Sequence, residues 1–217
     1  MRFKAETDLI KVIKQEILSV YSRTNIEIFE EISLGFGIAD IVICDSKVSS
    51  QKQRIGVPAL NRTDANIYQI IHKSKTASFD VIYDTTRCSK KSISLSLNKL
   101  IRHKYIEQVN DYFTINQEYK FPYNNAFAIE AKLRDWKRAL NQAHRYKWFA
   151  EYAFVVLDAH YAQPAIKNLD LFKRYNVGLV TLSPDGSFTR HFKPIKQKPY
   201  DPIMQILLSE KLKAIKH

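Results

Sequence analysis

The sequence predicts an α/β protein with a mixed sheet, interrupted by an inserted helical domain. Three observations lead to this prediction. First, some segments have apolar residues at helical spacing, whereas other, shorter segments are continuously apolar or alternate apolar and polar residues, as strands do. Second, these predicted helices and strands follow one another along the chain. Third, a polar stretch over 46–54 separates the first predicted helix and strands from a mainly helical pattern. We expect residues 1–50 and 121–217 to form a discontinuous α/β domain and residues 51–120 to form the insertion.

The segment before the polar stretch predicts a helix and two strands. Apolar residues recur at helical spacing over 4–21, with Glu6 in the first turn. Two segments, 25–34 and 36–45, are separated by Gly35 and are typical of strands, and the second is rich in Ile and Val.

After residue 120 the α/β pattern resumes. Strands are expected at 125–133, 153–159, 177–186 and 187–192, and helices at 135–152 and 164–176. Strands that alternate with helices imply parallel neighbours, so the whole sheet is expected to be mixed. The tail from residue 201 has apolar residues at helical spacing; it is either a packed terminal helix, which we favour, or a homodimer contact.

The insertion predicts three helices and a hairpin. The helices are expected at 61–73, 78–86 and 89–106, with Asn61 or Thr63 capping the first and Ser89 the third. The segment that follows alternates apolar and polar residues around a turn at 110–111. This pattern resembles a winged helix-turn-helix domain, in which the hairpin is the wing.

The charge of the chain makes a nucleic acid the expected partner. Lys and Arg number 34 against 22 Asp and Glu, a formal net charge of +12, and residues 52–120 alone carry 12 basic against 6 acidic side chains. Residues 89–104 contain no acid, and groups there suit phosphates and base edges: Lys90, Lys91, Ser92, Asn98 and Lys99. The alternative is a protein-contact domain with a solvated basic face.

The strongest motif spans four predicted elements. Asp40 lies in "GFGIADIVI", Glu130 and Lys132 lie in "FAIEAKLRDW", and "QAHRY" places Gln142 and Tyr146 four apart on a helix. Together with Glu6, this ordered set resembles the PD-(D/E)XK nuclease superfamily, and the Gln-x-x-x-Tyr pattern resembles its RecB-like branch. The resemblance implies a restriction-endonuclease-like αβββαβ core that the insertion interrupts. Ala39 stands where a proline often precedes the acid.

The resemblance implies a Mg²⁺ site, with Mn²⁺ as a substitute. Asp40, Glu130 and the Ala131 backbone carbonyl would hold the ion, because hard Mg²⁺ prefers such oxygens, and Glu6 would complete the metal shell either directly or through a water molecule. Lys132 would orient or deprotonate the attacking water or stabilise the developing charge. The alternatives are a turn residue at Asp40, a surface ion pair of Glu130 with Lys132, and a helix-dipole carboxylate at Glu6.

The predicted helix over 135–152 carries the remaining candidates. Gln142 and Tyr146 would touch the site or the strand being cut. Basic residues near the site would bind phosphates or only solvate the helix: Arg134, Lys137, Arg138 and Arg145.

We therefore expect a metal-dependent DNA nuclease, an endonuclease acting on duplex or branched DNA. The alternatives are a DNA-binding protein on a nuclease-like fold that does not cut, and a nuclease directed at RNA. Cys44 and Cys88 lack metal-binding spacing, and no signal peptide or membrane-spanning run occurs in the sequence. These features predict a cytoplasmic protein that does not enter a membrane.

Overall fold

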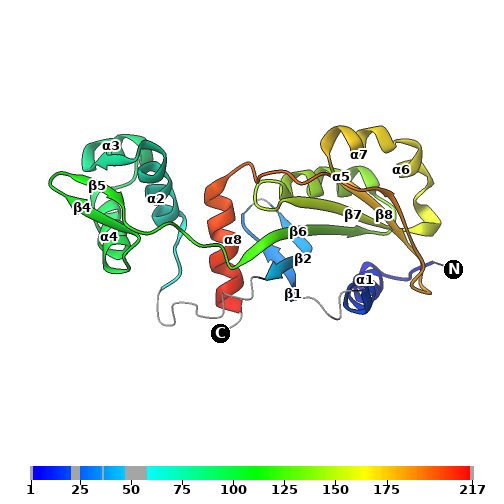
Figure 1. Ribbon diagram of the computed structural model, residues 1–217. Coiled ribbons are helices and arrows are strands. Elements are labelled where there is room, and N and C mark those ends of the chain that lie inside the picture. Colours follow the sequence, from blue (N-terminus) through cyan, green and yellow to red (C-terminus); the bar gives the residue numbers. More distant parts are fainter. Residues whose placement is uncertain (1, 21–24, 36, 47–57, 216–217) are drawn as a thin grey trace. The chain divides into compact units, whose positions relative to one another are not determined.

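The computed structural model describes residues 2–20, 25–35, 37–46 and 58–215, shown in Figure 1. The chain divides into two compact units. The first unit contains Met1–Gln51 and Tyr123–Tyr200, and the second contains Lys52–Pro122 and Asp201–His217. The predicted polar stretch at 46–54 lies almost wholly outside the described residues.

A six-stranded mixed sheet forms the first unit, which confirms the predicted α/β class. The antiparallel pairs are β1 with β2, β2 with β6, and β8 with β9, whereas β6, β7 and β8 are parallel neighbours. The strand order is β1 (Ile26–Ser33), β2 (Ile38–Ser46), β6 (Tyr123–Lys132), β7 (Tyr152–Asp158), β8 (Gly178–Leu182) and β9 (Phe188–Phe192).

Helices cover both faces of this sheet. The helix α1 (Glu6–Val20) buries Leu9 and Ile13 in a cluster with Ile41 and Ile129, which share one face of the sheet. Glu130, the next residue after Ile129, points to the opposite face, where it meets the helix α5 (Trp136–Tyr146). The sheet is thus a middle layer between α1 and α5 (Figure 1).

Two predicted helices are shorter than expected. The helix predicted over 135–152 ends at Tyr146, whose carbonyl accepts the N–H groups of Phe149 and Ala150 in a closing turn. The helix predicted over 164–176 is split into α6 (Gln163–Lys167) and α7 (Leu169–Tyr175), which follow the 3₁₀ turn η2 (Ala159–Tyr161). The break lies at Asn168, whose side chain donates to the Pro164 carbonyl and competes with the helical backbone.

The second unit combines helices with a small antiparallel sheet. Its elements up to residue 122 are α2 (Arg62–Ser74), β3 (Thr76–Ser78), α3 (Phe79–Thr86), α4 (Lys90–Arg102), β4 (Ile106–Val109) and β5 (Tyr112–Ile115). Asn61 caps α2 and Ser89 caps α4, as the sequence predicts. The strand β3 is not predicted, because three residues are too few for a periodic signal; it pairs with β5.

The C-terminal helix α8 (Pro202–Ile215) corrects the predicted domain boundary. It was expected within the α/β domain of residues 121–217, but it belongs to the second unit, where Ile206 lies in the apolar core. Glu210 of this helix accepts the Leu60 N–H at 2.9 Å. The apolar spacing predicts the helix correctly but cannot tell which core the helix joins. Among the described residues, no helix is long and apolar enough to cross a membrane.

Candidate active site

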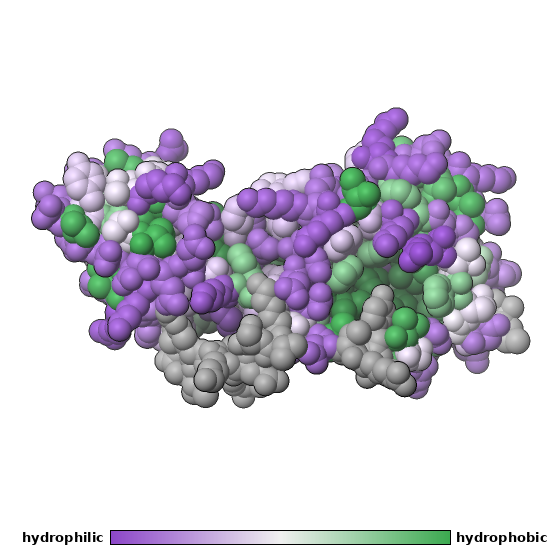
Figure 2. Space-filling model, viewed as in Figure 1, coloured by the Kyte–Doolittle hydropathy of each residue, from purple (hydrophilic) through white to green (hydrophobic). Residues whose placement is uncertain are grey.

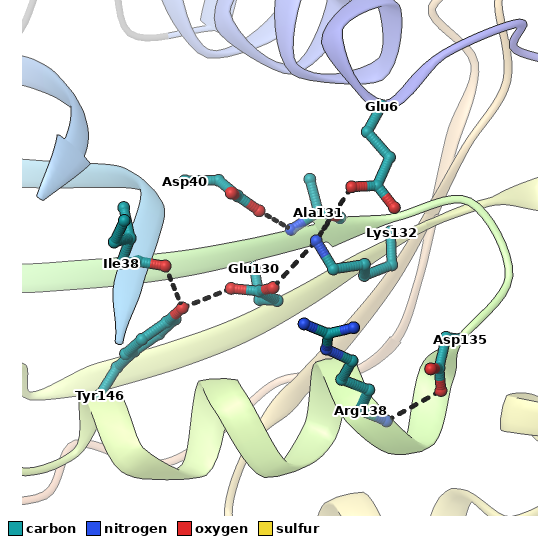
Figure 3. Close-up of polar contacts among 9 residues, drawn as sticks. All are labelled: Glu6, Ile38, Asp40, Glu130, Ala131, Lys132, Asp135, Arg138 and Tyr146. Carbon is teal, nitrogen blue, oxygen red and sulfur yellow. Dashed lines mark hydrogen bonds and ion pairs between the residues drawn. The ribbon is translucent and has the colours of Figure 1, made fainter. Parts of the chain in front are cut away.

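The predicted site residues come together from four elements at one end of strands β2 and β6 (Figure 3). The printed register pairs Ile41 with Ile129, so Asp40 and Glu130, one residue further along, lie opposite one another on the same face of the sheet. The pairing of β2 with β6 therefore brings these two acids together, although they are far apart in the sequence. Glu6 approaches from α1 and Tyr146 from α5.

Asp40 is half-buried and is bound to the neighbouring strand. Its Oδ2 accepts the Ala131 N–H at 2.7 Å. Burial raises the pKa of this carboxyl above its ordinary value, although the Ala131 hydrogen bond and the charge of Lys132 act in the opposite direction. Asp40 is therefore an integral part of the β2–β6 junction, not a free turn residue.

Glu130 is fully buried, which excludes a surface ion pair. Its Oε2 accepts a hydrogen bond from the Tyr146 hydroxyl, and its Oε1 faces the Lys132 ammonium at 3.2 Å. Burial raises the pKa of Glu130; the Tyr146 hydrogen bond lowers it, and the charge of Asp40 raises it again. The two carboxylates are thus close enough to influence each other.

The Tyr146 hydroxyl lies between two acceptors. It is 2.6 Å from the Ile38 carbonyl oxygen and also contacts Glu130, yet a phenol has only one proton to donate. Burial and the Glu130 contact raise the pKa of Tyr146. The phenol therefore stays neutral and fixes the Glu130 carboxylate against the start of β2. Sequence reasoning missed the Ile38 carbonyl, because a backbone acceptor leaves no signal in residue identities.

Lys132 joins three of the candidate groups. Its Nζ lies 3.0 Å from Glu6 Oε2, 3.2 Å from Glu130 Oε1 and 3.2 Å from the Ala131 carbonyl oxygen. Burial alone would lower the pKa of Lys132, but the hydrogen bond to Glu6 and the charges of Glu130 and Asp40 raise it overall. Glu130 and Lys132 therefore do form an ion pair, but one that is protected from solvent and not on the surface, since the Lys132 side chain is 16% exposed.

The helix α5 carries further polar candidate residues. Gln142 lies one turn before Tyr146, and its Oε1 is buried without a hydrogen-bond partner in the described part of the chain. The Arg138 guanidinium extends from α5 toward Glu130 and Lys132 (Figure 3). By contrast, Lys137 packs 5.7 Å from the Trp136 ring and Arg145 is exposed.

The donor set is suited to a hard cation, although it is small. The described residues contain no group of three or more His, Cys, Asp or Glu side chains placed to hold a metal ion. Two carboxylates, Asp40 and Glu130, and the Ala131 carbonyl do meet here. Mg²⁺ commonly takes one or two carboxylates and completes its shell with water and phosphate oxygens. The buried Oε1 of Glu130, which forms an ion pair with Lys132 at 3.2 Å, is a further oxygen that fits such a role.

In the second unit the predicted nucleic-acid contacts separate into two groups. Lys90, Lys91 and Asn98 are exposed on α4, with Lys90 lying 5.5 Å from the Tyr83 ring, and Ser92 is half-buried in the first turn. Lys99 instead points inward, where its Nζ lies 2.7 Å from Asp64 Oδ2 and donates to the Ala59 carbonyl at 2.6 Å. Lys99 therefore has a structural partner in the buried Asp64, which residue types alone do not indicate. Hydrophilic residues cover most of the face of this unit seen in Figure 2.

Comparisons with known proteins assign no family to this chain. The chain matches no protein-family model, and searches of curated proteins and of solved structures found no significant similarity.

Proposed function

We propose that this chain is a Mg²⁺-dependent nuclease that hydrolyses phosphodiester bonds in DNA. The supporting observation is the meeting of Asp40 and Glu130 across β2 and β6, beside the Lys132 ammonium. The PD-(D/E)XK resemblance requires this juxtaposition, and chance matches to so short a motif have no reason to provide it.

Asp40, Glu130 and the Ala131 carbonyl would hold the metal ion, and Mn²⁺ would replace Mg²⁺ in the same set of oxygens. A bound divalent ion neutralises charge on the scissile phosphate and lowers the pKa of a water molecule that it binds. The protein contributes a pre-formed arrangement, because Asp40 is fixed by the Ala131 N–H and Glu130 by the Tyr146 hydroxyl.

The Lys132 ammonium would bind an oxygen of the scissile phosphate and stabilise the negative charge that develops there. Glu6 and Glu130 hold this ammonium from two sides, so its position does not depend on the substrate. Glu6 thus acts as a positioning residue for Lys132, instead of the metal ligand that the resemblance allowed. Tyr146 has the same kind of role for Glu130, and Gln142, one turn before Tyr146 on α5, offers a buried amide oxygen.

The second unit would bind the DNA. Its order of helix, short strand, two helices and hairpin is similar to that of winged helix-turn-helix domains. The exposed Lys90, Lys91 and Asn98 lie on the α4 surface, and α4 contains no acidic residue. Such a helix suits the major groove, where Lys binds phosphates and guanine edges and Asn binds adenine.

A cleavage assay with a matched lysine control tests the proposal. Wild type is expected to nick or cut plasmid DNA with Mg²⁺ or Mn²⁺, Lys132→Met to lose the activity, and Lys173→Met to keep it. Lys173 also forms an ion pair in the first unit, with Asp170 at 3.1 Å, but on the exposed helix α7. Intact plasmid, linear, single-stranded and branched DNA after incubation with wild type would refute the proposal, as would full activity in Lys132→Met.

A second candidate is a DNA-binding protein on this fold that does not cut. The observation that favours it is the pairing of Lys132 with Glu6 and with the fully buried Glu130, which is a sufficient structural reason for a lysine here. Calorimetric titration with Mn²⁺ separates the two candidates. Retained DNA binding without any metal-binding heat would favour the second. The same cleavage assay with RNA in place of DNA tests the RNA-directed alternative.

A further inference from the structure

A half-buried tyrosine lies between two exposed arginines in the first unit. Tyr161, the last residue of η2, accepts hydrogen bonds at its hydroxyl from Arg2 Nη1 at 2.9 Å and from Arg134 Nη2 at 2.8 Å. The Arg134 guanidinium carbon also lies 4.2 Å from the centre of the Tyr161 ring. Three residues far apart in sequence thus converge on one oxygen atom.

Buried contacts beneath this cluster hold it in place. The carboxylate of Asp158, which is fully buried at the end of β7, accepts the Phe3 N–H through Oδ2 and the His160 N–H through Oδ1, each at 2.9 Å. These bonds fix the backbone next to Arg2 and next to Tyr161. Arg2 and Tyr161 therefore start from a rigid base, which lowers the entropy lost when the cluster binds a ligand.

The positive charge of the cluster is not balanced. Neither Arg2 nor Arg134 forms an ion pair within the described part of the chain, and both oxygens of Asp158 are already occupied by backbone donors. Desolvation acts to raise the pKa of the Tyr161 hydroxyl, but the hydrogen bonds and charges of Arg2 and Arg134 lower it overall. Two guanidinium groups without a carboxylate are a typical site for an anion.

We propose that Arg2, Arg134 and Tyr161 form a phosphate-binding subsite, which holds one phosphate of a nucleic-acid strand beside the candidate active site. This inference rests on the proposed function for the identity of the ligand. Arg134 follows Lys132 by two residues, a chain length of at most about 7 Å, so the subsite is within reach of a phosphate neighbouring the one being cut. Each guanidinium has five N–H donors and uses one on Tyr161, which leaves the others for phosphate oxygens.

The phosphate has two possible sources, a diester within the strand and a monoester at a strand end. Both present the same anionic oxygens to the arginines. A pair of short single strands, one with a 5′-phosphate and one with a 5′-hydroxyl, distinguishes the two sources.

The test measures binding of both strands by fluorescence anisotropy over a range of salt concentrations, in EDTA so that no cleavage takes place. The variant is Arg2→Gln with Arg134→Gln in the full chain. The matched control is Arg174→Gln with Arg190→Gln, which removes the same charge from two exposed arginines elsewhere in the first unit. Tyr161→Phe is a third variant, which keeps the ring under Arg134 and removes only the hydroxyl.

The subsite predicts that Arg2→Gln with Arg134→Gln weakens binding about tenfold and reduces the slope of log affinity against log salt by about 0.7 to 1.4, the change for one or two lost contacts to a single strand. The control pair should change both quantities clearly less. Loss with both strands identifies an internal phosphate, and loss with only the phosphorylated strand identifies a terminal one. Tyr161→Phe should weaken binding less than the double arginine change.

Equal binding by the double variant and the control pair would overturn the subsite. A double variant with a lower melting temperature but unchanged strand binding would also overturn the subsite, because the cluster would then serve only stability. Failure of the wild-type protein to bind either strand would overturn it as well. The outcome is separable from the cleavage result. Loss of binding without any wild-type cleavage refutes the proposed function alone, whereas wild-type cleavage with unchanged variant binding refutes the subsite alone.

Discussion

Replacing Lys132 by Met removes the ammonium from between two carboxylates and keeps most of the aliphatic stem. In the wild-type chain the Nζ lies 3.0 Å from Glu6 Oε2 and 3.2 Å from Glu130 Oε1. Glu6 is half-exposed and can be solvated after the change, but Glu130 is fully buried and has no water to replace the lost charge. The cost of the substitution therefore comes mainly from Glu130.

Removing one partner of a buried ion pair typically costs about 3–5 kcal/mol. Here Tyr146 still donates to Glu130, and Glu130 can take up a proton, so we expect a smaller loss of about 2–3 kcal/mol. For a unit of this size such a loss lowers the melting temperature by roughly 5–10 °C.

The loss should depend on pH with a definite sign. The pKa of Glu130 is already raised by burial, so Glu130 favours the folded state most below its ordinary pKa, and this contribution is lost as the pH rises through the folded value. Loss of the Lys132 charge raises the folded pKa further. The variant should therefore be most destabilised at neutral and alkaline pH and should approach wild type near pH 4.5.

Urea unfolding in EDTA at several pH values measures the effect, and a double-mutant cycle with Glu130→Gln isolates the pair. In the Glu130→Gln background, Lys132→Met should cost much less, because no buried charge remains. A cost of the same size in both backgrounds, and at acidic and alkaline pH, would refute the reasoning that Lys132 neutralises Glu130.

Other substitutions give further expectations. Tyr146→Phe should destabilise the fold by about 1–3 kcal/mol, measured by urea unfolding, because it removes the donor shared by Glu130 and a backbone carbonyl. Lys99→Met should destabilise the second unit by about 2 kcal/mol, since it leaves a buried carboxylate unpaired, whereas the exposed Lys91→Met should lower only DNA affinity in an anisotropy assay. Burial lowers the pKa of His144, so stability should fall as the pH drops below about 6.5, and His144→Asn should flatten that part of the thermal unfolding profile.

The sequence predicts the elements of this fold better than their grouping. Periodicity identifies α1, α5 and the long strands, because each buries a regular apolar face. It does not identify β3, whose short pairing with β5 depends on tertiary contact, or the break at Asn168, which depends on a side-chain hydrogen bond. It also assigns α8 to the wrong unit, since an apolar helical face carries no information about its partner.

At the candidate site, too, the sequence predicts residue types but not the contacts that their side chains make. A motif search finds Asp40, Glu130 and Lys132, because the proposed chemistry requires those residue types at those positions. It misses the inward turn of Lys99, because an exposed and a buried lysine look alike in a sequence. It also misses Arg2 and Tyr161, whose only sequence signal is their type and which meet through the folding of η2.

The charges at the site favour a cation-binding role over a purely structural network. Glu6 and Glu130 contact a single ammonium, that of Lys132, and the charge of Asp40 also acts on it. Arg138 points toward these groups without forming an ion pair in the described contacts. A network that served only stability would be expected to balance its charges, since each unpaired buried carboxylate costs free energy. Burial raises the pKa of both Asp40 and Glu130, so the folded state disfavours the charged form of each carboxyl. A divalent cation between these two carboxylates would remove that excess. Glu130→Gln should therefore stabilise the metal-free protein at alkaline pH. If these carboxylates bind a cation, Mn²⁺ should raise the melting temperature of wild type and leave that of Glu130→Gln unchanged. A purely structural network predicts no rise with Mn²⁺ in either protein.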